Sequence, residues 1–203
     1  MSAGRDERVG AIVLAGGRSS RFGRDKLVEE IDGRALLDRA VDAVRAVATD
    51  KDVVVVMAPG REIPAAGVAR VVRDPFAHGG PLVGVATGLQ ALDDRVGRVI
   101  IVGGDMPTLH PMVLRRLLGT VGPEHPAVLL ELPAGEAPHA PALPAAFDRA
   151  AATAMVGGLV EGGERRLRAL AEHLGITIVP WADWQVDDPD ARTLRDIDTP
   201  DDL

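Results

Sequence analysis

A continuous apolar run that ends in two glycines is the feature that most constrains this chain. The run extends from Val9 to Ala15 and has the length and composition of a strand buried on both faces of a parallel sheet. Gly16 and Gly17 follow directly, and residues 18–26 then carry four cations, Arg18, Arg21, Arg24 and Lys26. Glycines let backbone N–H groups approach an anion closely, and cations neutralise it. The stretch therefore predicts a strand that delivers a polyphosphate-binding loop.

Composition excludes several classes of chemistry. The 203 residues suffice for one α/β domain with a buried core. The chain has no cysteine, which excludes disulfides, thiolate catalysis, iron–sulfur clusters and cysteine-ligated zinc. The five histidines show no metal-ligand spacing. The net charge of −7 argues against nonspecific binding to nucleic acid, which needs a basic surface.

The first eight residues are polar, and no apolar run approaches the roughly 18 to 20 residues of a membrane span. We therefore expect a soluble cytoplasmic protein with no membrane partner.

Strand and helix patterns alternate through the first 119 residues. Strands are expected at Val9–Ala15, Asp52–Met57, Arg70–Arg73 and Arg98–Val102, and helices at Arg34–Val47, Pro81–Leu92 and Pro111–Leu118. This alternation predicts a doubly wound, mostly parallel sheet, whose ligands bind outside the carboxyl ends of the strands. Gly16, Asp74 and Asp105 each follow a predicted strand, so we expect them to share one cleft.

The second half of the chain is less regular. Six prolines fall between Gly122 and Pro144, which we interpret as a lobe inserted beside the sheet. Any strand at Ala127–Leu132 should be an edge strand or end quickly. Further along we expect a helix over part of Ala145–Val156, a helix at Glu164–Leu174 and a strand at Ile176–Val179. Tryptophans 181 and 184 should lie in a polar loop, and a terminal helix should be capped by Thr199.

Three familiar site motifs are absent from the sequence. The first loop lacks the G-K-[ST] of a Walker A motif and also lacks G-x-G-x-x-G. None of the three serines lies in the G-x-S-x-G of a hydrolase. The phosphate-binding loop is therefore of another kind.

The remaining residues suggest metal-assisted phosphoryl or nucleotidyl transfer. Asp105 follows the apolar run VIIV and two glycines. Carboxylate oxygens are ligands that Mg²⁺ prefers. Lys26 and Arg21 would neutralise charge on the transferred phosphoryl group and on the departing pyrophosphate. Asp74, before Pro75, would accept a hydrogen bond from a base or a ribose hydroxyl, unless it only shapes a turn.

The motifs of this chain resemble those of molybdenum cofactor guanylyltransferases. LAGGRSSRFGRDK at residues 14–26 resembles the nucleotidyltransferase signature L-A-G-G-x-S-x-R-[MF]-G-x-D-K. Asp74 with GPLVG at 80–84, GGDMP at 103–107, GGERRLRAL at 162–170 and DIDTPDDL at 196–203 resemble later motifs in the same order. The resemblance spans nearly the whole chain and implies a three-layer α/β/α, Rossmann-like nucleotidyltransferase fold of the GT-A type.

The resemblance also implies a reaction. GMP would pass from GTP to the terminal phosphate of molybdopterin, with Mg²⁺ as cofactor and pyrophosphate as the second product. Because the acceptor phosphate is already an anion, no general base is required. A molybdoenzyme or a delivery chaperone would be a further protein partner.

In family terms, the site residues divide into two sets. The GTP set comprises Leu14, Ala15, Gly16, Gly17, Lys26, Asp74, Gly80 and Asp105, with catalysis assigned to Lys26, Arg21 and Asp105 and the metal to Asp105. The acceptor set comprises Arg165, Arg166, Asp196 and Asp198. The chain would be a single domain, with residues 1–119 as the nucleotide half and 120–203 as the acceptor half.

The choice of nucleotide and two departures from the family pattern leave alternatives open; the departures are the acids Asp196 and Asp198 and the Pro- and Ala-rich stretch from Gly135 to Ala146. The Gly16-Gly17 pair favours GTP, whereas cytidylyltransferase relatives tend to have Ala-Gly there. Asp196 and Asp198 stand where some members have asparagine, and two acids would repel a pterin phosphate unless a cation lies between them or they face solvent. The alternatives are a CTP-dependent transferase, a transferase acting on a sugar phosphate, and a nucleotide-binding protein that delivers the cofactor without catalysis.

Overall fold

The computed structural model describes residues 8–16, 25–60, 70–76, 79–133 and 142–202. Its nine strands are β1 (Arg8–Ala15), β2 (Glu30–Ile31), β3 (Arg34–Ala35), β4 (Val53–Met57), β5 (Arg70–Arg73), β6 (Val96–Gly103), β7 (Ala127–Leu130), β8 (Ala145–Asp148) and β9 (Ile176–Val179). Its α-helices are α1 (Leu36–Arg45), α2 (Pro81–Ala91), α3 (Pro111–Thr120), α4 (Arg149–Glu161), α5 (Leu167–Leu174) and α6 (Trp181–Trp184). Short 3₁₀ helices are η1 (Lys26–Val28), η2 (Asp50–Asp52), η3 (Arg192–Leu194) and η4 (Pro200–Asp202).

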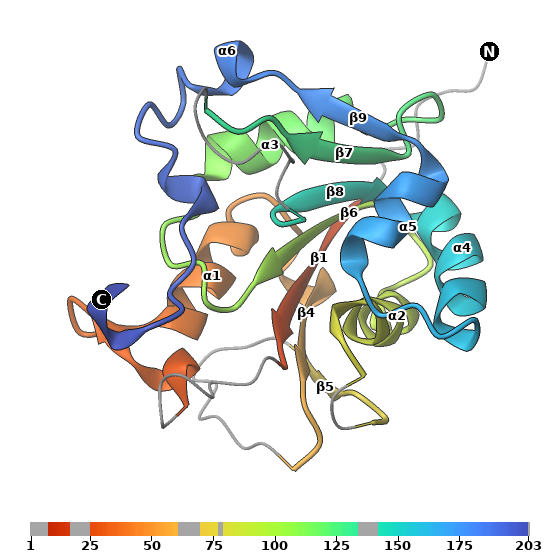
Figure 1. Ribbon diagram of the computed structural model, residues 1–203, viewed down its shortest axis with the longest axis horizontal. Coiled ribbons are helices and arrows are strands. Elements are labelled where there is room, and N and C mark those ends of the chain that lie inside the picture. The colour runs from red at the N-terminus through yellow and green to blue at the C-terminus, as the bar shows by residue number, and fades with distance from the viewer. Residues whose placement is uncertain (1–7, 17–24, 61–69, 77–78, 134–141, 203) are drawn as a thin grey trace.

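A seven-stranded sheet in the order β5-β4-β1-β6-β8-β7-β9 forms the centre of the molecule (Figure 1). β1 lies between β4 and β6 and is parallel to both, with Ala11 level with Val53 and Ile100. β8 is the antiparallel member, placed between β6 and β7. The predicted mostly parallel, Rossmann-like sheet is confirmed.

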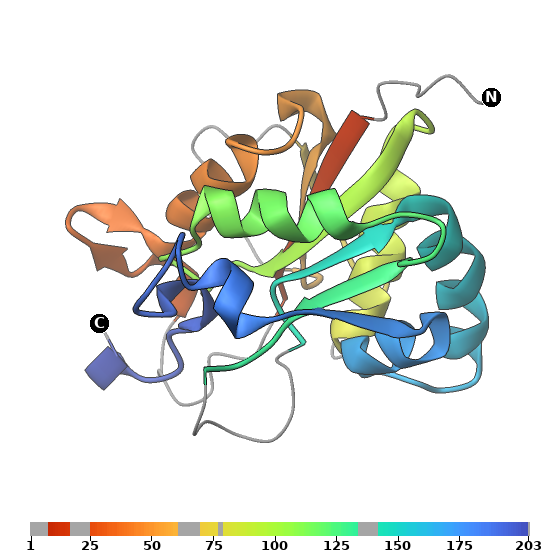
Figure 2. The same ribbon diagram turned by 90° about the horizontal axis from the view of Figure 1, so that it is seen from above.

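Helices cover both faces of the sheet, which produces three layers. Side chains of α1, α3 and α6 pack on one face together with Ala11 and Val13 of β1. Side chains of α2, α4 and α5 pack on the other with Ile12, as Figures 1 and 2 show. Because successive residues of β1 enter opposite hydrophobic clusters, the strand has no polar face. That double burial is the physical reason for the uninterrupted apolar run.

The first half of the chain follows the predicted pattern closely. The strands expected before residue 103 and the helices at Pro81 and Pro111 are present. The helix predicted from Arg34 begins instead at Leu36, because Arg34–Ala35 pairs with Glu30–Ile31 as a small hairpin. Gly119 lies inside α3, which continues to Thr120.

In the described part of residues 122–144, the predicted inserted lobe was wrong, and residues 134–141 lie outside the described residues. The strand does end early, at Leu130, but it is not an edge strand. β7 is fully buried and has β8 on one side and β9 on the other, so it belongs to the main sheet. Prolines 123, 126 and 133 flank Ala127–Leu130 and remove no N–H from the strand itself.

The helix predicted across Ala145–Val156 was also partly wrong. Ala145–Asp148 forms β8, and the helix begins only at Arg149. Asp148 ends the strand and caps the helix, since its carboxylate accepts a hydrogen bond from the N–H of Ala151 at 2.8 Å. Likewise, the helix expected from Glu164 starts at Leu167.

The tryptophan region is a helix and not a polar loop, which corrects another prediction. Trp184 is fully buried in α6, and its indole Nε1–H donates to the carbonyl of Glu131 at 3.0 Å. At the end of the chain, Thr199 precedes η4 as expected, but the capping acceptor is Asp202. Its carboxylate accepts from the backbone N–H of Thr199 at 2.7 Å and from its hydroxyl at 2.9 Å. Among the residues described, no helix is both long and apolar enough to cross a bilayer.

Candidate active site

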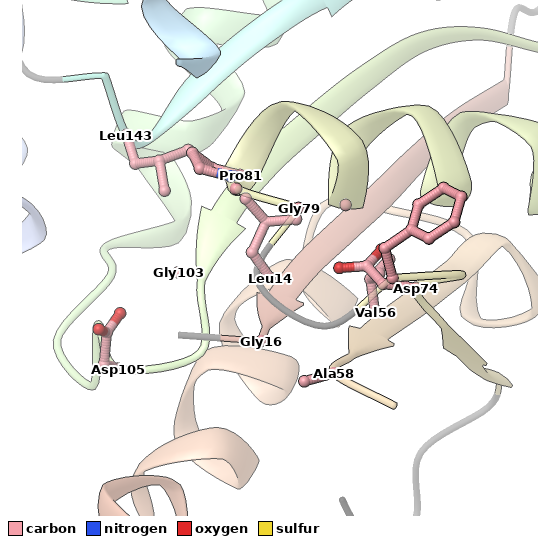
Figure 3. Close-up of a pocket in the computed structure, with 13 residues that line it drawn as sticks. Leu14, Gly16, Val56, Ala58, Asp74, Gly79, Pro81, Gly103, Asp105 and Leu143 are labelled. Atoms are coloured by element: carbon pink, nitrogen blue, oxygen red, sulfur yellow. The ribbon is translucent and has the colours of Figure 1, made fainter. Parts of the chain in front are cut away.

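A cavity of about 580 Å³ opens at the carboxyl edge of the sheet, where β1, β4, β5 and β6 end (Figure 3). The chain leaves β1 toward α1 on one face and reaches β6 through α2 on the other, so the cavity lies at the topological switch point of the sheet. The residues that line it are Leu14, Gly16, Val56, Ala58, Asp74, Phe76, Gly79, Gly80, Pro81, Gly84, Gly103, Asp105 and Leu143. The common cleft expected for Gly16, Asp74 and Asp105 is therefore present.

Asp74 supplies a partly buried carboxyl group to one end of the cavity. Its backbone N–H donates to the carbonyl of Met57 at 2.9 Å, which fixes the residue at the end of β5. Within the described ranges, no hydrogen-bond partner reaches its buried Oδ1 atom. Burial raises the pKa of Asp74, and a hydrogen bond with Thr87 opposes that rise. Asp74 thus lines the cavity with a carboxyl group whose buried Oδ1 atom is an unsatisfied acceptor among the described residues.

Asp105 lies at the other end of the cavity, as Figure 3 shows. Its carboxyl group folds back over the end of β6, so that a Cβ atom on Gly103 would clash with Oδ1 of Asp105. A side chain at residue 103 would therefore displace the Asp105 carboxyl group from this position. Gly104, directly after β6, is also bonded to β1, because its N–H donates to the carbonyl of Leu14 at 2.9 Å.

Lys26 is nearly buried and contacts Asp105 directly. Its ammonium nitrogen lies 2.8 Å from Oδ2 of Asp105 and 3.0 Å from Oδ1 of Asp198, and it donates to the carbonyl of Ile197 at 2.7 Å. Burial alone would lower the pKa of Lys26, but the hydrogen bonds and charges of Asp105 and then Asp198 raise it above its ordinary value. The lysine therefore stays protonated as a cation beside the carboxylate of Asp105.

Asp196 and Asp198 have different surroundings. The side chain of Asp198 is 53% exposed and pairs with Lys26. Although Asp196 is largely exposed, partial burial of its carboxyl group and then repulsion from Asp198 and Asp105 raise the pKa of Asp196. The cation beside Asp198 is therefore the ammonium group of Lys26.

Arg165 and Arg166 lie away from the two aspartates, at the turn between α4 and α5 (Figure 1). The Arg165 guanidinium donates to the carbonyls of Val160 at 3.0 Å and of Glu164 at 2.8 Å. Arg166 binds the Glu164 carboxylate through Nε at 3.1 Å and Nη2 at 2.7 Å. The side chain of Arg166 in particular is 71% exposed. The structure therefore does not bring the four expected acceptor residues together.

The backbone of Arg165 nevertheless contacts the cavity wall. The N–H of Leu82 donates to the carbonyl of Arg165 at 3.1 Å. Gly80 has φ = 83°, and a Cβ atom there would lie 2.8 Å from Cβ of Arg165. Gly80 is thus needed both for its left-handed backbone and for this close approach.

The remaining predicted residues are placed as follows. Leu14 and Gly16 line the cavity, whereas the side chain of Ala15 is buried in the core. Gly17 and Arg21 lie outside the described residues.

Phe76 is a cavity residue that the sequence reasoning missed. It lines the cavity and is 68% exposed, although the chain has only three phenylalanines. An aromatic residue two positions after the strand-end Asp74 was the available signal.

The donor set at Asp105 fits a magnesium ion that shares its ligands with a substrate. Among the described residues, no group of three or more His, Cys, Asp or Glu side chains could hold a metal ion on its own. Mg²⁺ is usually held by one or two carboxylates together with substrate phosphates. Asp105 provides such a carboxylate, and it already faces a cation, the ammonium group of Lys26.

Comparisons with known proteins agree with this geometry. The sequence pattern of the MobA-like NTP transferase domain matches residues 11–184. A probable molybdenum cofactor guanylyltransferase of Chloroflexus aggregans is 34% identical over 202 residues, which cover 95% of this chain and 90% of that protein. A protein of the same name from Mycobacterium avium is 30% identical, with 97% and 93% covered.

Solved structures share the fold at lower identity. Molybdopterin-guanine dinucleotide biosynthesis protein A from Archaeoglobus fulgidus superposes with a TM-score of 0.73 at 21% identity, covering 95% of this chain and 94% of that one. A 2-C-methyl-D-erythritol 4-phosphate cytidylyltransferase from Thermus thermophilus gives 0.69 at 19% identity, with 94% and 93% covered. With a seven-stranded sheet of the same class, a cavity at its carboxyl edge and a sequence match over most of its length, this chain belongs to the MobA-like NTP transferase family.

Proposed function

We propose that this protein transfers GMP from GTP to the terminal phosphate of molybdopterin and releases pyrophosphate. One observation carries the proposal: the cavity is lined by the carboxyl group of Asp74 at one end and by Asp105, paired with Lys26, at the other. The first end suits a nucleoside and the second suits phosphates with a metal ion. The names of the relatives from Chloroflexus aggregans and Mycobacterium avium support the same reaction.

The nucleoside would lie between Asp74 and Phe76. Guanine carries N–H donors, and the carboxyl group of Asp74 would accept from a base or a ribose hydroxyl. The exposed ring of Phe76 offers a face on which a base can stack. Leu14, Gly16 and Gly80 would complete the walls of this subsite.

The reaction would proceed by direct displacement at phosphorus. An oxygen of the molybdopterin phosphate would bond to the α-phosphorus of GTP, while the bond to the bridging oxygen of the β-phosphate breaks and pyrophosphate departs. Asp105 would hold Mg²⁺, which when bound supplies positive charge against the phosphate oxygens. Lys26 would donate to the same oxygens as negative charge builds up on the leaving group.

We propose that residues 1–119 bind the nucleotide and that residues 120–203 contribute the acceptor side. Arg166 is exposed and follows Arg165, whose backbone lies against Gly80 at the cavity wall. The guanidinium of Arg166 would attract the molybdopterin phosphate.

The proposed reaction is tested by product analysis. Purified protein is incubated with molybdopterin, Mg²⁺ and each of the four ribonucleoside triphosphates separately, and the products are identified by mass. We expect a guanine dinucleotide of molybdopterin and pyrophosphate with GTP. A cytosine dinucleotide formed in preference would contradict the proposal and favour a CTP-dependent transferase.

The variant Asp105→Asn separates an enzyme from a delivery protein. An enzyme should lose most turnover, because one metal ligand is weakened, while GTP binding is partly retained. If the variant releases cofactor to an apo-molybdoenzyme as well as the wild type does, and neither makes product, the protein is a carrier and the proposed catalysis is wrong.

A further inference from the structure

The segment Ile197–Asp198 reaches across the fold to the nucleotide half of the chain. The carbonyl of Ile197 and the carboxylate of Asp198 accept from the ammonium of Lys26, which is 171 and 172 residues away in sequence. The N–H of Ile197 donates to the carbonyl of Asp105 at 3.0 Å. One short segment therefore contacts both the lysine and the proposed metal ligand.

This segment is held in place independently of Lys26. The side chain of Ile197 is fully buried against Leu36. Beyond it, Asp202 accepts from the backbone N–H groups of Asp198 at 3.0 Å and Thr199 at 2.7 Å. The carboxylate of Asp198 is thus presented by a backbone that is anchored on both sides.

The ammonium group of Lys26 has three N–H donors, and three acceptors lie within hydrogen-bond distance of it among the contacts of the described residues. Two of them, the carbonyl of Ile197 and the carboxylate of Asp198, belong to the anchored segment. The third, Asp105, is the residue that we propose as metal ligand. If Asp105 held a metal ion, the carbonyl of Ile197 and the carboxylate of Asp198 would still hold the ammonium group at the edge of the sheet.

We infer that Asp198 is a positioning residue for Lys26: with a metal ion bound at Asp105, it would keep the ammonium group aimed at the nucleotide phosphates. The inference rests on the proposed function, and it moves Asp198 from the acceptor set to the nucleotide set. It also gives a reason for an acid at this position, since a carboxylate holds an ammonium more strongly than an amide does.

The test compares Asp198→Ala and Asp198→Asn with the matched control Asp201→Asn, an exposed acid in the same segment. Binding of GTP with Mg²⁺ is measured by calorimetry without acceptor, and KM values are measured for GTP and molybdopterin separately. We expect Asp198→Ala to weaken GTP binding about tenfold or more, the size of effect from losing a hydrogen bond to a charged group. The KM for molybdopterin should stay near the wild-type value.

Asp198→Asn should recover part of the loss, because its amide oxygen still accepts from the ammonium, and Asp201→Asn should bind GTP as the wild type does. In a Lys26→Met background, Asp198→Asn should cause no further loss of GTP affinity, since the partner that it positions is gone. A rise in the KM for molybdopterin with unchanged GTP binding, or equal losses from Asp198→Asn with and without Lys26, would overturn the inference. Failure of the wild type to bind GTP or form product would instead refute the proposed function.

Discussion

Two cation–carboxylate clusters lie on either side of the carboxyl edge, and they differ in burial and in origin. Lys26 has a side chain only 10% exposed, and its partners Asp105 and Asp198 are distant in sequence. Arg166 has a side chain 71% exposed, and its partner Glu164 is two residues away. The same pairing chemistry therefore occurs once in the interior, fixed by the fold, and once at the surface, fixed by a local turn.

The difference shows which cluster the protein depends on. A buried ammonium must be compensated, because removing it from water is unfavourable and only well-placed acceptors offset that cost. An exposed pair is screened by solvent and contributes little. We therefore expect the Lys26 cluster to govern activity and the Glu164–Arg166 ion pair to contribute little to stability.

The largest effect should come from Lys26→Met, which keeps an unbranched side chain and removes the charge. We expect kcat/KM for GTP to fall by about 10²- to 10³-fold, the range for losing one preorganised electrostatic donor. Steady-state kinetics with varied GTP would measure the loss. Lys51→Met, which alters the other lysine of the chain at an exposed position, serves as the control. Equal activity of the two variants would show that Lys26 is only structural.

Gly80→Ala tests whether the turn that carries Arg165 and Arg166 needs its close backbone contact with Gly80. The residue has φ = 83°, and the new Cβ would lie 2.8 Å from Cβ of Arg165. We expect the free energy of unfolding to fall by about 2 kcal/mol, measured by urea denaturation. In Gly119→Ala the new methyl group meets no atom within 4 Å, and that helix variant should be stabilised by up to about 1 kcal/mol. Losses of the same size in both would argue against the strain at Gly80.

Phe76→Ala tests whether the Asp74 end of the cavity binds a base. Loss of a stacking face should raise the Kd for GTP about tenfold, as calorimetry in the presence of Mg²⁺ would detect. Phe76→Trp retains an aromatic face and should bind GTP nearly as well as the wild type. If both variants bind equally to the wild type, the base does not contact this ring.

Glu164→Gln should produce the smallest effect, and one that depends on pH. Hydrogen bonds from Arg166, first from its side chain and then from its backbone, lower the pKa of Glu164 from 4.5 to about 2. Because the folded pKa is depressed, the stabilisation is complete above about pH 4.5 and is lost as the pH falls toward 2. The Tm difference between wild type and variant should therefore shrink over that interval. Glu161→Gln, an exposed neighbour, should show no such trend.

The sequence predicts best what is local or repeated along the chain. The apolar run before Gly16 and the strand-end positions of Asp74 and Asp105 were sufficient to predict the sheet and the cavity. β8 was missed because its two alanines favour helix, and only pairing with β6 and β7 makes the segment a strand.

The features that the sequence did not predict depend on contacts between residues that are distant in the sequence. The burial of Trp184 depends on a carbonyl at Glu131, and the pairing of Lys26 with Asp198 depends on residues 172 positions apart. Neither contact leaves a periodic signal in the sequence. Asp198 was consequently expected to face the acceptor, and its contact with the lysine emerged only from the tertiary structure.

The reversed strand β8 has a consequence for where the connection from β7 lies. Because β8 runs against β6 and β7, the chain leaves β7 after Leu130 and enters β8 at Ala145 on the same edge of the sheet, and Leu143 there lines the cavity. Antiparallel neighbours can be joined at a single edge of a sheet, whereas parallel strands need a crossover to the opposite end. The reversal thus places both ends of this connection at the cavity edge of the sheet, where a parallel β8 would have begun at the opposite end.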